Sequence, residues 1–152
     1  MYKIKAKATG EMYAGKFFKN QVSDMGPKDQ LGCLRELEIL REVSHPFIIE
    51  YVEEFNYNKQ HLCIVTKYAP GGDLEQYIKK QSKISEEDAM SYFAMILLGL
   101  HYLHNKNIIH RDLKPGNILI DQLANGVKVL KIGDFNISKI DFILDPNLST
   151  LG

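Results

Sequence analysis

The sequence predicts an α+β fold in which a small antiparallel sheet with one helix precedes the first part of a mainly helical region. Up to residue 68, most segments have alternating or continuous apolar residues, which indicate strands. The exception is residues 30–43, where the apolar residues recur at helical spacing and predict one helix. After Pro70-Gly71-Gly72 the apolar residues recur at helical spacing instead. We therefore expect two units, residues 1–69 and residues 70–152.

The first unit begins with a predicted hairpin. Apolar residues alternate with lysines from Tyr2 to Ala8, as they do in a half-buried strand. Thr9-Gly10-Glu11 is the expected turn, and a second strand covers Met12 to Phe18. Residues 20–29, which contain Gly26-Pro27, are expected to form a loop.

A helix and a second hairpin complete the predicted first unit. The helix covers Gln30 to Val43, where the apolar residues at helical spacing are Leu31, Leu34, Leu37, Ile39, Leu40 and Val43. Two further strands, Phe47 to Phe55 and Leu62 to Tyr68, are expected to pair across the polar turn at residues 56–60.

The second unit contains two predicted helices and a short hairpin. Asp73 and Ser85 are expected to cap helices, of which the first ends near Gln81 and the second is longer. The core face expected for the longer helix consists of Ala89, Tyr92, Phe93, Ile96, Leu97, Leu100 and Leu103. Two apolar strands follow, at residues 118–120 and 127–132.

Charge and composition exclude several classes of function. The formal net charge of the 152 residues is zero and the lysines are scattered, so we expect no nucleic-acid partner. The apolar run from Ala94 to Leu98 is too short for a bilayer, and the N-terminus lacks the apolar stretch of a signal peptide. Cys33 and Cys63 lack metal-ligand spacing and are expected to be buried free thiols. These features predict a cytoplasmic protein without a membrane partner.

One segment carries the residue types of phosphoryl transfer: His110-Arg111-Asp112-Leu113-Lys114-Pro115-Gly116-Asn117. That reaction needs a carboxylate to orient the attacking hydroxyl, cations to neutralise phosphate charge, and oxygen ligands for Mg²⁺. Asp112, Lys114 and Asn117 supply these types within one loop. The segment resembles the catalytic loop of the protein kinase family, which implies a bilobal protein-kinase-like fold.

Other parts of the sequence fit the same resemblance. Asp134-Phe135 follows the predicted hairpin, where the family has its Mg²⁺-binding aspartate. Ala14-Gly15-Lys16 resembles the family's strand lysine, and Glu36 resembles the helix glutamate that pairs with it. Spacing alone does not distinguish Glu36 from Glu38, and the distance to His45-Pro46 favours Glu36.

The resemblance implies a catalytic set and its cofactors, ATP and Mg²⁺. Asp112 would orient the acceptor hydroxyl, and Lys114 would stabilise the transferring phosphoryl group. Asn117 and Asp134 would bind Mg²⁺, while Lys16, paired with Glu36, would position the ATP phosphates. Lysine two residues after the catalytic aspartate is typical of kinases that act on serine and threonine, so the implied partner is a protein with such an acceptor.

The resemblance also implies residues that contact the nucleotide. Backbone groups around Lys67, Tyr68 and Ala69 would bind the adenine edge, and Thr66 would border the pocket behind it. Ala14 and Leu119 complete the implied nucleotide-binding set.

The sequence departs from the family's pattern in three places. The chain begins after the position of the glycine-rich phosphate loop, and it stops at Gly152 within the expected activation segment. We therefore expect either a piece of a longer protein or a chain that is not stable alone, with little or no turnover by the 152 residues themselves. Asn136 replaces the glycine of Asp-Phe-Gly, where a positive φ is expected and asparagine is the best-tolerated substitute. The alternative to an active kinase is therefore a degenerate kinase fold used for binding.

Two finer expectations concern subfamily and regulation. Three segments resemble NIMA-related kinases: the hinge, which is residues 64–74, the long helix after Ser85, and residues 148–152. Arg111 before the catalytic aspartate implies control by phosphorylation in the activation segment, for which Ser149 and Thr150 are the expected sites.

Overall fold

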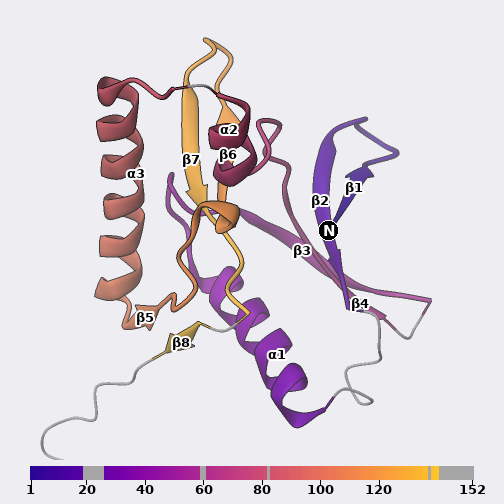
Figure 1. The fold of residues 1–152 in the computed structure, drawn as a ribbon. Helices are drawn as coiled ribbons and strands as arrows, with labels where there is room; N and C mark the ends of the chain where they lie inside the picture. The colour runs from indigo at the N-terminus through magenta and orange to yellow at the C-terminus, as the bar shows by residue number, and fades with distance from the viewer. Residues whose placement is uncertain (19–25, 59–60, 82, 137, 141–152) are drawn as a thin grey trace, which may run out of the picture.

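The computed structural model describes residues 1–18, 26–58, 61–81, 83–136 and 138–140 (Figure 1). Its first part is a four-stranded antiparallel sheet in the order β1-β2-β4-β3. The strands are β1 (Tyr2–Lys5), β2 (Met12–Phe17), β3 (Tyr51–Tyr57) and β4 (His61–Lys67). One helix, α1 (Pro27–Glu42), accompanies this sheet. The predicted α+β class and the small antiparallel sheet with one helix are confirmed.

The helix α1 begins earlier than predicted. Gly26 is its N-cap and Pro27 is its first residue, so the expected loop at residues 20–29 is wrong from Pro27 onward. Proline suits this position because its missing N–H would have no helical partner there. Leu37, Ile39 and Leu40 face the core as expected, whereas Leu31 and Leu34 are exposed.

The third strand begins later than predicted. The expected strand from Phe47 to Phe55 starts only at Tyr51, and the segment before it runs beside a strand of the second part instead. The Ile49 N–H donates to the Ile132 carbonyl at 2.9 Å, and the Ile132 N–H donates to the Phe47 carbonyl at 2.9 Å. These bonds satisfy buried backbone groups and join the two parts of the chain.

The second part consists of two helices and short strand pairs. Its elements are α2 (Leu74–Lys80), α3 (Glu86–Asn105), β5 (Ile108–Ile109), the 3₁₀ turn η2 (Pro115–Asn117), β6 (Ile118–Gln122), β7 (Lys128–Ile132) and β8 (Lys139–Ile140). Both predicted caps are confirmed: Asp73 Oδ1 accepts from the Gln76 N–H at 2.8 Å, and Ser85 Oγ accepts from the Asp88 N–H at 3.0 Å. The sequence did not predict β5, η2 and β8, because elements of two or three residues are too short to show a period.

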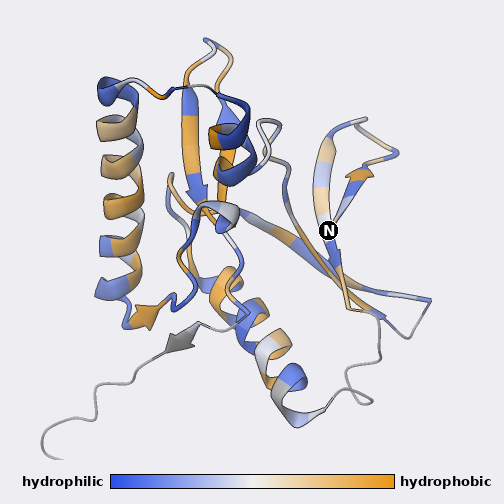
Figure 2. Cartoon of the chain, viewed as in Figure 1, coloured by the Kyte–Doolittle hydropathy of each residue, from blue (hydrophilic) through white to orange (hydrophobic). Residues whose placement is uncertain are grey.

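The core face predicted for α3 is only partly correct. Tyr92 and Leu103 are buried, and Ile96 and Leu100 pack against the core. Three other residues of the predicted face are exposed: Ala89, Phe93 and Leu97. The helix packs mainly on β7 and to a lesser extent on β5, and these contacts leave Phe93 and Leu97 exposed. Figure 2 shows how far apolar residues extend along the middle of α3.

Buried residues from both parts of the chain belong to one core cluster. Phe135 is 0% exposed and belongs to the same cluster as buried residues of α1, α3, β4, β6 and β7. Cys33 and Cys63 are buried free thiols, as predicted. Among the described residues, no helix combines the length and the apolar character needed to cross a membrane.

Candidate active site

Lys16 lies at the centre of a partly buried ion-pair cluster. Its Nζ is 2.8 Å from both carboxylate oxygens of Glu36 on α1 and 2.9 Å from Asp134 Oδ1. Glu36 is 3% exposed, whereas Glu38 is an exposed residue of the same helix. The predicted pair of Lys16 and Glu36 is confirmed, and Glu38 is excluded as the partner.

Burial and ion pairing oppose each other in this cluster. Burial raises the pKa of Glu36, and the attraction of Lys16 offsets that increase only in part. Burial alone would lower the pKa of Lys16, but the carboxylates of Glu36 and Asp134 outweigh it and leave that pKa raised. Lys16 therefore keeps its positive charge in a place that can receive phosphate oxygens.

Asp112, Lys114 and Asn117 form a second cluster in the loop after β5. Asp112 Oδ2 accepts hydrogen bonds from Lys114 Nζ at 2.7 Å and from Asn117 Nδ2 at 2.9 Å. Asn117 Nδ2 also donates to the Asp112 carbonyl at 2.8 Å, since the η2 turn brings residue 117 back over the loop. The hydrogen bonds from Lys114 and Asn117 lower the pKa of Asp112, so its carboxylate is ionised at neutral pH.

His110 connects this loop to the turn that carries Asp134, a role that the sequence did not reveal. Its Nδ1 accepts from the Asp112 N–H at 3.3 Å, and its Nε2 donates to the Gly133 carbonyl at 2.9 Å. Its ring also meets that of Phe135 edge to face, with 5.1 Å between centroids. Burial lowers the pKa of His110, and both hydrogen bonds suit the neutral ring.

Two residues of the site have left-handed backbone conformations. Arg111 has φ 64° and Asp134 has φ 62°. Each such conformation costs about 1–2 kcal/mol for a residue with a Cβ, and such strain gathers at functional sites. Asn136 is not among the described residues with positive φ, so the reason expected for an asparagine there is wrong.

The oxygen atoms of Asn117 and Asp134 suit a magnesium ion. Asn117 uses its amide nitrogen for Asp112, which leaves the amide oxygen as an acceptor. Asp134 gives one carboxylate oxygen to Lys16, which leaves the other for a cation. Mg²⁺ typically binds one or two protein oxygens and completes its shell with phosphate and water, so this donor set fits it. The described residues contain no group of three or more His, Cys, Asp or Glu side chains that could hold a metal.

Part of the expected nucleotide-binding set lies around the Lys16 cluster. A small cavity is lined by Lys16, Glu36 and Asp134 together with Thr66 and Leu119. Ala14 pairs with Thr66 across β2 and β4, so it lies at the same end of the sheet.

Some groups of the hinge, at the end of β4 and just after it, already interact with other residues of the protein. The Lys67 N–H donates to the Glu50 carbonyl at 2.9 Å, and the Ala69 carbonyl accepts from the Gly72 N–H at 3.3 Å. The Tyr68 ring lies 4.5 Å from the Lys3 ammonium. The Lys67 N–H and the Ala69 carbonyl are therefore already hydrogen-bonded within the protein.

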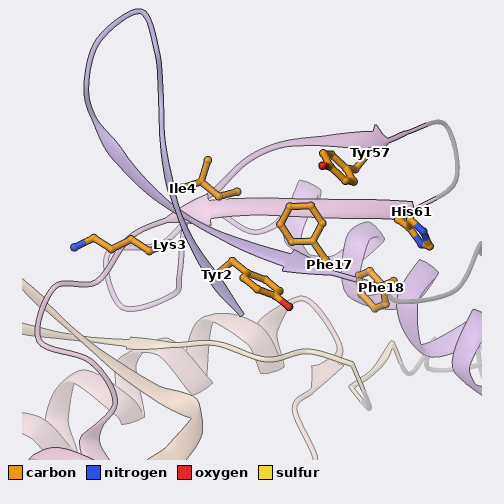
Figure 3. A pocket seen from close by; sticks show the side chains of 7 residues that line it. All are labelled: Tyr2, Lys3, Ile4, Phe17, Phe18, Tyr57 and His61. Atoms are coloured by element: carbon orange, nitrogen blue, oxygen red, sulfur yellow. The ribbon is translucent and has the colours of Figure 1, made fainter.

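A larger cavity of about 550 Å³ lies away from this chemistry (Figure 3). Its lining residues are Tyr2, Lys3, Ile4, Phe17, Phe18, Tyr57 and His61. Phe17 follows Lys16 in β2, and successive strand side chains point to opposite faces of a sheet. The cavity thus lies on the face of the sheet opposite the Lys16 cluster.

The expected phosphorylation sites, Ser149 and Thr150, lie outside the described residues.

A family profile of the protein kinase domain matches residues 1–141 of the chain. The serine/threonine-protein kinase Nek8 of Danio rerio is 46% identical over 121 residues, which is 78% of this chain and 17% of that protein. Protein kinase 3 of Dictyostelium discoideum is 38% identical over 140 residues, which is 91% of this chain and 15% of that protein. The chain thus spans a small fraction of the length of these relatives.

A solved structure extends the similarity to three dimensions. The crystal structure of the Rad53 kinase domain and SCD2 superimposes with a TM-score of 0.75 at 29% sequence identity. The similarity covers 91% of this chain and 48% of that one. The nekl-2 serine/threonine-protein kinase of Caenorhabditis elegans, 41% identical over 124 residues, covers 76% of this chain. Relatives with Nek-type names agree with the resemblance to NIMA-related kinases.

Proposed function

The chain belongs to the protein kinase family, and we propose that the protein containing it transfers the γ-phosphoryl group of ATP to serine or threonine hydroxyls of proteins. The observation that carries this proposal is the position of Lys16, whose ammonium group lies between Glu36 and Asp134. Such a cation beside an oxygen donor for Mg²⁺ suits the binding of ATP phosphates. A domain used only for protein binding has no need of this buried charge.

In the proposed reaction Asp112 receives the proton of the acceptor hydroxyl. Its Oδ2 already accepts two hydrogen bonds, so Oδ1 is the oxygen left for the substrate. The hydroxyl oxygen forms a bond to the γ-phosphorus while the bond from that phosphorus to the bridging oxygen breaks, and ADP leaves. Lys114, beside Asp112, neutralises charge on the transferring group.

Lys16 and the two oxygen donors position the nucleotide. Asn117 and Asp134 would hold Mg²⁺, which neutralises the phosphate charge that develops during transfer. Glu36 fixes the Lys16 ammonium, so that its direction is set before the nucleotide binds. Thr66 and Leu119 supply part of the surface around this cavity.

Two further features belong to the same proposal. We place the boundary between the lobes after Ala69, where β4 has ended and α2 has not begun. The buried free thiols of Cys33 and Cys63 suit a reducing compartment such as the cytoplasm.

The proposal is tested by incubating the full-length protein with Mg²⁺, γ-labelled ATP and a mixture of acceptor peptides. We expect label on serine or threonine, identified by phosphoamino acid analysis, and loss of transfer when Mg²⁺ is chelated. Label on tyrosine would contradict the assigned acceptor, whereas failure to bind ATP and to transfer phosphate would contradict the kinase function itself.

A further inference from the structure

Gly32 lies on α1 one helical turn before Glu36, where the helix meets the Asp134-Phe135-Asn136 turn. A Cβ atom at position 32 would stand 2.9 Å from the Asn136 carbonyl oxygen and 4.0 Å from its carbonyl carbon. The first distance is shorter than a carbon can approach a backbone oxygen without moving it. Since glycine is less favourable than alanine within a helix, this close contact gives the glycine a reason to be there.

The helix contacts the same turn a second time through Glu36. Residues four apart lie on one face of a helix, so positions 32 and 36 face the turn together. A hydrogen bond from the Phe135 backbone helps to lower the pKa of Glu36 against the effect of burial. Glu36 also holds Lys16, and Lys16 holds Asp134, so the position of the helix sets the geometry of the whole cluster.

We propose that Gly32 is a positioning residue, whose missing side chain lets α1 close onto the Asp134–Asn136 turn so that Glu36 can fix Lys16. The inference rests on the proposed function, because it concerns the lysine that positions the nucleotide. Gly32 itself touches no substrate and acts through Glu36. A side chain at position 32 would move α1 outward and displace Lys16 from its place between the two carboxylates.

With asparagine at position 136, the carbonyl that faces Gly32 is less free to move than it would be with glycine there. A residue with a Cβ has a smaller range of backbone conformations than glycine, so the Asn136 carbonyl has fewer ways to turn away from the helix. Positions 32 and 136 should therefore be coupled: a methyl group at position 32 should be better tolerated when position 136 is glycine.

The test compares Gly32→Ala with Gly26→Ser in the full-length protein. Gly26→Ser is the control on the same helix, because a Cβ at position 26 meets nothing within 4 Å and serine is a favourable residue at the N-cap position that Gly26 occupies. The first readout is the rate at which N-ethylmaleimide labels Cys33, measured by mass spectrometry of its peptide. Cys33 follows Gly32 on α1 and is 2% exposed, so labelling reports whether the helix has moved. Cys63, which is 0% exposed in the sheet, reports global unfolding.

The second readout is kcat/KM for ATP-dependent transfer. For Gly32→Ala we expect faster labelling of Cys33 with Cys63 still protected, and a loss in kcat/KM of about 10- to 100-fold, as for displacements near 1 Å. Gly26→Ser should match the wild type in both readouts. The double variant Gly32→Ala/Asn136→Gly should recover part of the lost activity and of the Cys33 protection relative to Gly32→Ala.

Unchanged Cys33 labelling and unchanged kcat/KM in Gly32→Ala would overturn the inference. If Gly32→Ala exposes both thiols, the double variant decides: renewed protection of Cys63 supports the contact with position 136, and continued exposure rejects it. A wild-type protein without kinase activity would refute the proposed function, while the labelling rates would still show whether the contact holds the helix.

Discussion

At the scale of single residues, the charge on Glu36 depends on Lys16. Glu36 is 3% exposed, and a buried carboxylate without a partner is strongly unfavourable. We expect Lys16→Met to lower the free energy of unfolding by about 3 kcal/mol, as removal of one partner of a buried ion pair does. Lys16→Met/Glu36→Leu should lose less, because the fully buried carboxylate is gone and only Asp134, whose side chain is 35% exposed, has lost its lysine partner.

Urea unfolding of the three proteins measures this difference. Lys79→Met is the control, since Lys79 pairs with Glu75 on the surface of α2 and such pairs contribute about 0–1 kcal/mol. Equal destabilisation in the single and double variants would show that Lys16 does not compensate the buried charge.

His110 predicts how stability depends on pH. Burial lowers its pKa in the folded protein, so the unfolded chain binds a proton more readily. The stability it gives is complete above the unfolded pKa near 6.5 and is lost as the pH falls through the folded pKa, by at most about 1.4 kcal/mol per pH unit. His110→Gln should remove this part of the slope, and exposed His104→Gln should not.

Thermal or urea unfolding between pH 5 and 8 tests the assignment to His110. The wild type and His104→Gln should both weaken below about pH 6.5, and His110→Gln should weaken less steeply. A slope in His110→Gln as steep as in the wild type would place the titrating group elsewhere.

The residue types of the site could be predicted from the sequence, whereas their backbone conformations could not. Asp112, Lys114 and Asn117 lie within six residues, so their local spacing already requires them to share a loop. Arg111 and Asp134 adopt positive φ although neither is glycine, and only the surrounding structure imposes that conformation. The link from His110 to Gly133 joins residues 23 apart in the chain, which no local pattern reveals.

At the scale of elements, α3 shows what periodicity predicts and what it misses. The start of α3 after Ser85 could be predicted, because it depends on a hydrogen bond between two residues close in sequence, from the Asp88 N–H to Ser85 Oγ. Its core face depends on which elements pack against it, and the described part of the chain supplies mainly β7. Phe93 and Leu97 have the spacing of core residues and are nevertheless exposed.

Gly99 of α3 lies close to β7 and to the segment before β3. A Cβ there would lie 2.9 Å from Ile132 Cδ1 and 3.1 Å from the Phe47 carbonyl oxygen. We expect Gly99→Val to lower the free energy of unfolding by about 1–3 kcal/mol through overpacking. The control is Ala94→Val, which places the same side chain at an exposed position of the helix.

Differential scanning calorimetry of both variants checks this prediction. Gly99→Val should melt at a clearly lower temperature than Ala94→Val, because both gain a β-branched residue and only one meets the strand. Equal melting temperatures would mean that the helix and β7 separate easily at this point.

At the scale of the whole molecule, backbone bonds join the two predicted units. The segment before β3 belongs to the first unit in sequence and pairs with Ile132 of β7 in space. The fold class followed from the change of period at Pro70-Gly71-Gly72, because each unit has its own regular elements. The contact between the units did not follow, since it involves residues about 85 positions apart that show no shared pattern.

The same arrangement brings the two charge clusters together through His110 and Phe135. Lys16 and Glu36 come from the sheet part, while Asp112, Asn117 and Asp134 come from the second part. The central claim is that these clusters act together, one on the nucleotide and one on the acceptor hydroxyl.

The most direct test of this claim compares Asp112→Asn with the wild type in the full-length protein. The variant should lose phosphoryl transfer while its affinity for Mg²⁺-ATP stays largely intact, because Asp112 is assigned to the hydroxyl. Asp121→Asn removes a carboxylate of β6 outside both clusters and should keep full activity. Equal turnover by Asp112→Asn and the wild type would contradict the account.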